Sequence, residues 1–153
     1  MKRSVTHATF TIERVYKAAP AKVFAAFADS TQKAAWFHGP PEWPPDVHSL
    51  DFRVGGRETS RGGPKDGPQS TMEARYWDIV PNERIVCTYD MHLDDKRISV
   101  SLNTIELRPE GTGTRLILTE AGAYLDGYDN AAGREEGTRG LLEMLAAYVD
   151  RQM

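Results

Sequence analysis

The sequence is poor in cysteine and has no long hydrophobic run. Cys87 is the only cysteine among 153 residues, so neither an internal disulfide nor a zinc site built from several thiolates can form. No apolar stretch approaches the ~20 residues that a membrane-spanning helix needs. The basic residues near the N-terminus are not followed by an apolar segment of signal-peptide length. We therefore expect a cytoplasmic protein that does not insert into a membrane.

The chain also lacks an excess of charge of either sign. Nineteen basic and 22 acidic residues give a net charge of −3. A nucleic-acid-binding protein normally presents clustered Lys and Arg to the phosphates, and because no such cluster occurs we expect no nucleic-acid partner. A composition of 40% apolar and 27% charged residues is typical of a globular protein, and the length predicts a single domain over 1–153.

Motifs for metal binding, phosphate binding and covalent catalysis are missing as well. Four histidines, His7, His38, His48 and His92, are scattered without the short spacings of a metal site, and we expect them in solvated loops. No glycine-rich segment has the lysine of a phosphate-binding loop, and no serine has the context of a nucleophile elbow. We expect no metal and no cofactor.

The first part of the chain predicts one strand and two short helices. Residues 6–16 alternate between apolar and polar, as in a half-buried strand, although Arg14 interrupts the alternation and indicates a bulge or strand end there. A proline at the first position and apolar residues at helical spacing predict a helix over 20–28. Asp29 can cap a second short helix that ends near Phe37.

Prolines and glycines mark the segments that follow. Residues 38–46 contain four prolines and predict an ordered loop that carries Trp43. Residues 50–54 alternate and predict a strand that ends at a glycine pair. Residues 61–68 combine glycines and prolines, which indicates a flexible hairpin tip or a mobile flap.

The second half of the chain predicts an antiparallel meander followed by a long helix. Strands are expected over 70–80, 84–91, 97–107 and 113–120, because turn residues separate short alternating runs. The period then changes to that of a helix over 131–151. We expect this helix to face the sheet with its Leu141, Leu145 and Tyr148 side.

Short motifs distributed along nearly the whole chain resemble the SRPBCC superfamily of START-like, birch-pollen-allergen-like helix-grip proteins. Within it, the chain is similar to the bacterial branch named after the activator of heat-shock-protein-90 ATPase, also described as polyketide-cyclase-like. The resemblance implies an α+β fold, in which a curved antiparallel sheet of about six to seven strands wraps around a long C-terminal helix and two short helices follow the first strand. Its residues are Ala19-Pro20-x-x-Val23-Phe24, Trp36-Phe37-x-Gly39-Pro40, Arg53-Val54-Gly55-Gly56, Ile79-Val80-Pro81, Arg84-Ile85-Val86, Thr88-Tyr89, Gly113-Thr114-x-Leu116 and Thr119-Glu120-x-Gly122.

The superfamily resemblance leaves three functions open. Its members bind lipids, hormones or polyketides, act as cyclases, or accompany regulators, and a fold alone does not select among these. The first expectation is binding of a small, mostly hydrophobic molecule in an internal cavity, by a monomer or a homodimer. The alternatives are a cyclase- or dehydratase-like enzyme and a chaperone-ATPase activator or regulator partner.

A cavity in such a fold is expected between the concave face of the sheet and the last helix. Small-molecule pockets are mostly apolar with a few placed polar groups. The same side chains can also fill a core that has no cavity. The apolar wall candidates are Trp36, Phe37, Phe52, Tyr76, Tyr89, Met91, Leu118 and Leu142.

Polar candidates come from the last helix and two of the strands. Arg134 and Thr138 lie four residues apart on the helix, and Glu120 ends the last predicted strand. Together an arginine and a glutamate can hold a polar ligand group or transfer a proton, or they can form a structural ion pair at the rim. One face of the 97–107 strand carries the hydroxyl and amide groups of Ser99, Ser101 and Asn103. These groups are further candidates if that face is concave, which the sequence leaves open.

Overall fold

The computed structural model describes residues 2–151 and contains one seven-stranded antiparallel sheet and three helices. The strands follow the spatial order β1-β7-β6-β5-β4-β3-β2. Their bounds are β1 Val5–Tyr16, β2 Val47–Leu50, β3 Arg57–Gly62, β4 Ser70–Val80, β5 Arg84–Leu93, β6 Lys96–Glu110 and β7 Gly113–Leu125. The helices are α1 Pro20–Ala28, α2 Ser30–Trp36 and α3 Ala131–Arg151.

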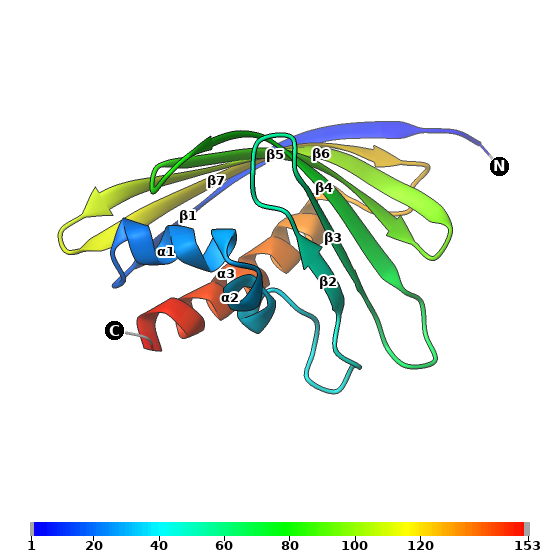
Figure 1. Cartoon of the computed structure of the whole chain (residues 1–153). Helices are drawn as coiled ribbons and strands as arrows, with labels where there is room; N and C mark the ends of the chain where they lie inside the picture. Colours follow the sequence, from blue (N-terminus) through cyan, green and yellow to red (C-terminus); the bar gives the residue numbers. More distant parts are fainter. Residues whose placement is uncertain (1, 152–153) are drawn as a thin grey trace.

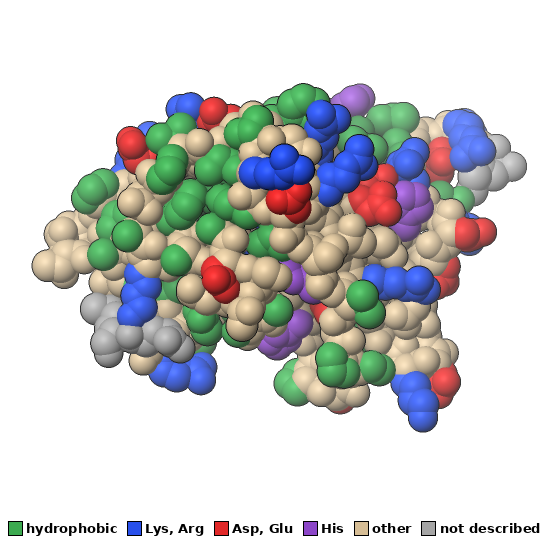
Figure 2. Space-filling view, viewed as in Figure 1, with side chains coloured by type: hydrophobic (Ala, Val, Ile, Leu, Met, Phe, Trp, Pro, Cys, Tyr) green, Lys and Arg blue, Asp and Glu red, His purple; other side chains and the backbone are tan. Residues whose placement is uncertain are grey.

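All three helices lie on the concave side of the curved sheet, with α3 running beneath it (Figure 1). This arrangement confirms the predicted α+β helix-grip fold and the predicted bounds of the last helix. On the face shown in Figure 2, acidic and basic side chains are interspersed. Within residues 2–151, no helix is long and apolar enough to cross a membrane.

Local sequence explains where the helices begin. Pro20 occupies the first turn of α1, where its missing N–H leaves no hydrogen bond unmade. Asp29 accepts a hydrogen bond from the backbone N–H of Gln32, 2.9 Å away, and so caps α2. Asn130 accepts one from the N–H of Gly133 at 2.8 Å at the start of α3.

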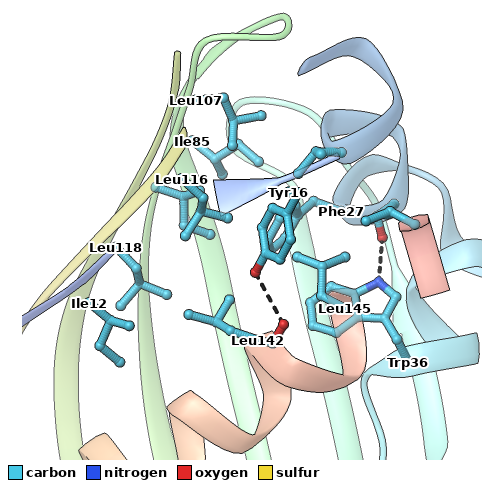
Figure 3. Close-up of a cluster of buried hydrophobic side chains, with 14 of the residues drawn as sticks. Ile12, Tyr16, Phe27, Trp36, Ile85, Leu107, Leu116, Leu118, Leu142 and Leu145 are labelled. Atoms are coloured by element: carbon cyan, nitrogen blue, oxygen red, sulfur yellow. Dashed lines mark hydrogen bonds between the residues drawn. The ribbon is translucent and has the colours of Figure 1, made fainter. Parts of the chain in front are cut away.

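The core occupies the end of the molecule where the second half of α3 meets the sheet (Figure 3). The buried stripe of the helix consists of Leu142, Leu145 and Val149. The expectation was confirmed for Leu145, which is fully buried, and was wrong for Leu141 and Tyr148, which are only partly buried and flank the stripe. Figure 3 also shows the Tyr16 hydroxyl donating to the carbonyl of Leu142, 3.1 Å away.

The region around residues 47–62 differs from the prediction. The strand expected over 50–54 was wrong: β2 lies before it and ends at Leu50, because Asp51, Arg53 and Gly56 form a turn through backbone hydrogen bonds. Strand β3 was not predicted. It takes in the first two residues of the expected flexible segment 61–68.

The irregularities of the sheet also lie elsewhere than expected. Strand β1 pairs with β7 without a register shift and ends at Tyr16, so of the two alternatives expected near Arg14 the bulge is wrong and the strand end is confirmed. The Arg14 side chain keeps the inward parity of the strand and reaches Glu143 of α3, with 3.1 Å between Nε and Oε1. The register shifts instead near Tyr76 in β4 and Met91 in β5.

The structure resolves which face of β6 points inward. Ser99 and Ser101 are buried, with 0% and 2% exposure, whereas Val100 and Leu102 on the other face are 45% and 46% exposed. Hydroxyl groups therefore occupy positions on the concave face at which a core strand would normally carry apolar side chains.

Candidate functional site

A cavity of about 490 Å³ lies between the concave face of the sheet, α2 and the first half of α3. The wall is mainly apolar and includes Phe27, Ile85, Ile105 and Leu141 besides the predicted residues. The apolar packing of α3 is confined to its second half, so the first half of the helix leaves this space beside the sheet.

Most of the candidate residues lie in the cavity wall. Eleven of them do so: Trp36, Phe37, Tyr76, Tyr89, Met91, Asn103, Leu118, Glu120, Arg134, Thr138 and Leu142. Three lie outside the wall. Phe52 packs edge-on against Phe24 and Tyr76, and Ser99 and Ser101 are buried on β6 behind the wall. Ligand binding by any of these residues remains a prediction.

Two helical glycines contribute to the wall from α3. Gly133 and Gly137 both line the cavity, whereas Gly140 does not. A Cβ atom built at Gly137 would meet nothing within 4 Å. The helix thus presents no side chain to the cavity at this position, although glycine costs about 1 kcal/mol relative to alanine in a helix.

The first of two polar groups in the wall, here called the Glu120 cluster, comprises Tyr89, Asn103, Glu120, Asp129 and Arg134 with Ser99 behind them. Glu120 Oε1 accepts hydrogen bonds from the Tyr89 hydroxyl at 2.8 Å and from Asn103 Nδ2 at 3.1 Å. Arg134 donates to Tyr89 at 3.0 Å, to Ser99 at 2.7 Å and to Asp129 at 2.8 Å. Its Nη1 atom lies 3.6 Å from Glu120 Oε2.

The Glu120 carboxyl group is 1% exposed and its pKa is raised. Burial is the main cause, and the hydrogen bond from Tyr89 and the charge of Arg134 only partly oppose it. The expected ion pair therefore exists, but it lies inside the molecule and not at a rim. Four buried polar atoms of this region have no hydrogen-bond partner within the described residues: Ser101 Oγ, Asn103 Oδ1, Glu120 Oε2 and Tyr124 Oη.

The second polar group, here called the Glu58 cluster, comprises Lys33, His48, Glu58 and Tyr76. Glu58 Oε1 lies 2.7 Å from Lys33 Nζ and accepts a 2.6 Å hydrogen bond from the Tyr76 hydroxyl. Its Oε2 atom lies 2.8 Å from His48 Nε2. Both carboxylate oxygens are therefore hydrogen-bonded, and the cluster joins α2 to β2, β3 and β4.

The charge of Lys33 and the hydrogen bonds decide the ionisation of Glu58. Burial alone would raise the pKa of this carboxyl group, but Lys33, His48 and Tyr76 together outweigh burial and lower the pKa to about 2. Glu58 is accordingly a carboxylate at neutral pH. Burial raises the pKa of the Cys87 thiol, which also lines the cavity, to about 12, so this cysteine is not an activated nucleophile.

Sequence reasoning missed the Glu58 cluster apart from Tyr76. His48 lies in β2 with a side chain that is 6% exposed, and His92 lies in β5, so the expectation that all histidines occupy solvated loops was wrong. One signal was available. Glu58 and Ser60 alternate with Arg57, Thr59 and Arg61 in β3, and a strand without apolar residues can only turn polar groups inward.

A curved antiparallel sheet, a long helix across its concave face and a cavity between them define a helix-grip protein. The chain belongs to the family described as "Activator of Hsp90 ATPase homolog 1-like protein", whose model matches residues 17–150. No curated protein matches the sequence.

Three solved bacterial structures illustrate the similarity. An uncharacterized protein from Rhizobium leguminosarum is 40% identical with a TM-score of 0.93, covering 99% of both chains. A protein from Rhizobium loti is 51% identical with a TM-score of 0.87, covering 95% of this chain and 99% of the other. A Chromobacterium violaceum protein is 28% identical with a TM-score of 0.76, covering 93% and 96%.

Proposed function

We propose that the protein binds a small, mostly hydrophobic molecule in the cavity beside α3. The observation that carries this proposal is a cavity of about 490 Å³ whose apolar wall contains two compact polar clusters. Pockets for small molecules typically measure roughly 300–1,000 Å³ and combine an apolar lining with a few oriented polar groups. The size and the composition of the cavity both fit this class.

The part of the cavity wall that α3 contributes favours a ligand cavity over an imperfectly packed core. Protein interiors are packed about as densely as organic crystals, so a helix facing a core normally fills the space with side chains. At Gly137, an exposed position that borders the cavity, this helix carries no side chain, and a larger residue would meet no neighbour at its Cβ atom. Because Gly137 borders the cavity and is exposed, it supports an access to the cavity for an occupant.

A matched pair of helix variants tests the proposal. Gly137→Leu places a side chain in the cavity, whereas Gly140→Leu makes the same change on the same helix outside the wall. With butylbenzene as the probe, we expect Gly137→Leu to weaken binding about tenfold or more, that is by at least about 1.4 kcal/mol. Gly140→Leu should bind like the wild type in calorimetric titration. Equal affinities of the two variants would place the binding site elsewhere.

The natural ligand can be sought directly. Native mass spectrometry of protein purified from its own host should show a mass increment that Gly137→Leu loses and Gly140→Leu keeps. An increment that both variants keep would indicate a molecule bound outside the cavity.

An enzyme that transfers protons, of the cyclase or dehydratase kind, is the second candidate, and the raised pKa of Glu120 favours it. The Glu120 carboxylate would take a proton from a carbon next to a substrate carbonyl while Tyr89 and Asn103 hold its other oxygen. The C–H bond breaks, the proton passes to Glu120, and the enolate recovers a proton from the carboxyl group.

Deuterium uptake tests this candidate. In heavy water, para-butylacetophenone should incorporate deuterium at its methyl group faster with wild-type protein than with Glu120→Gln, as followed by nuclear magnetic resonance. Uptake at the buffer rate with wild-type protein would argue against proton transfer while leaving ligand binding intact.

A further inference from the structure

The two polar clusters differ in how completely their hydrogen bonds are made. In the Glu58 cluster both carboxylate oxygens have partners. In the Glu120 cluster the Oε2 atom of Glu120 and the Oδ1 atom of Asn103 are buried and accept no hydrogen bond from residues 2–151. A buried polar atom left without a partner destabilises the folded state, because it has lost its hydrogen bond to water. The other two unpartnered atoms, Ser101 Oγ and Tyr124 Oη, are hydroxyls of residues outside the cavity wall. Among the residues that line the cavity, the deficit concerns acceptors, and what is missing there is a donor.

The charged side chains in the cavity wall also favour a ligand that donates a hydrogen bond over an anionic one. Lys33 is paired with Glu58 at 2.7 Å. Arg134 is paired with Asp129 at 2.8 Å and lies 3.6 Å from Glu120. Each of these cations already faces a carboxylate, so an anionic ligand would find no cation without such a partner at either cluster. A ligand with an anionic group bound to Arg134 is therefore disfavoured.

The side chains around Glu120 indicate that the rest of the ligand is apolar. Leu118 lies two residues before Glu120 on β7 and shares its inward parity, and Leu142 of α3 also lines the cavity. A molecule that reaches Glu120 with a polar group therefore lays its remaining body against apolar side chains.

We propose that the polar end of the ligand is a hydrogen-bond donor, a hydroxyl or phenol group that donates to Glu120 Oε2, and that the cavity selects against carboxylates. This inference rests on the proposed binding function and specifies the ligand class. The competing accounts are a proton on Glu120 itself and a hydrogen bond from the Ser101 hydroxyl, which also lowers the pKa of Glu120; either would remove the need for a donor from a ligand. Because burial raises the pKa of Glu120, the test is run at mildly alkaline pH, below the pKa of about 10 of a phenol, so that the carboxylate is favoured while the phenol keeps its proton.

Three probes of similar shape separate the possibilities in calorimetric titrations of the wild-type protein. We expect para-butylphenol to bind about tenfold more tightly than butylbenzene, in the range of a hydrogen bond to a charged group. We expect para-butylbenzoate to bind more weakly than either. A phenol without advantage over butylbenzene, or a benzoate that binds more tightly than the phenol, overturns the inference. Absence of binding by all three, butylbenzene included, overturns the proposed function itself.

A variant locates the preference. Glu120→Gln should lose the advantage of the phenol and retain the binding of butylbenzene. Glu136→Gln makes the same chemical change at an exposed position of α3 outside the wall and should leave both affinities unchanged. A phenol preference that survives in folded Glu120→Gln, checked by circular dichroism, contradicts the assignment. If this variant does not fold, the wild-type probe series still decides the inference.

Discussion

Lys33 Nζ lies 2.7 Å from Glu58 Oε1, and the two side chains are 9% and 1% exposed. This pair joins the short helix α2 to the strand β3, which carries no apolar residue of its own. Exposed ion pairs contribute little to stability, but removing one partner of a buried pair leaves a charge without compensation. The pair is therefore expected to matter for the stability of this end of the sheet.

The first prediction concerns the stability of the fold at acid pH. The pKa of Glu58 is about 2 in the folded protein against 4.5 ordinarily, so its contribution is present above pH 4.5 and is lost as the pH falls toward 2. The shift corresponds to about 3 kcal/mol. Urea unfolding between pH 2 and 6 should show this loss in the wild type and a flatter profile in Glu58→Gln. Parallel profiles would contradict the assigned role.

The pH dependence of stability that Glu120 causes should have the opposite sign, so this residue serves as a control. Its pKa is raised in the folded protein, so its contribution is present below pH 4.5 and is lost as the pH rises through the folded-state pKa. Glu120→Gln should consequently keep the acid destabilisation that Glu58 causes, while losing less stability than the wild type on the alkaline side.

A second prediction concerns the core contact of α3. Leu145 is fully buried, and Leu145→Ala should lower the free energy of unfolding by about 2–5 kcal/mol because it leaves a cavity. Leu102→Ala makes the same change at a position on the outer face that is 46% exposed, and should cost well under half as much. Urea denaturation measures both. Similar costs would mean that this side of the helix is not core.

Apolar periodicity explains how far the sequence could predict the fold. Helix α3 was predicted to the residue, because leucines recur at helical spacing and the preceding strands alternate. Glu120 and Arg134 could be placed near one another from strand parity and helix spacing. Their detailed bonding could not, since it depends on the register of β6 against β7.

The Glu58 cluster shows where this reasoning fails. Strand β3 points Glu58 and Ser60 inward, so its pattern contains no apolar period to detect. The inward position of His48 follows from its pairing with Ser60, a contact between segments that no local pattern reveals. On β6 the alternation was visible, but the more apolar side faces outward.

A third prediction concerns the segment 61–68, which we expect to act as a flap over the cavity mouth. Gly62 pairs with Ser70 in the β3–β4 ladder, whereas Lys65 and Asp66 are exposed at the tip. Amide hydrogen exchange should be fast at Lys65 and Asp66 and slow at Gly62. Slow exchange throughout the segment would rule out a flap, and a ligand in the cavity should slow the tip if it closes.

The last prediction separates the structural role of Arg134 from its role toward a ligand. The Arg134 side chain is 10% exposed and bonds Tyr89, Ser99 and Asp129, so Arg134→Met should do more than weaken binding. Breaking a buried ion pair by removing one partner typically costs about 3–5 kcal/mol, since the remaining charge stays buried.

Removing the second charge should recover part of that loss. In Arg134→Met combined with Glu120→Gln, the buried carboxylate next to Arg134 is gone, and urea denaturation should show a smaller loss than the sum of the two single variants. A loss below about 1 kcal/mol for Arg134→Met alone would mean that the guanidinium contributes little to the fold. Additive losses would mean that the 3.6 Å approach of Arg134 to Glu120 carries no coupling energy.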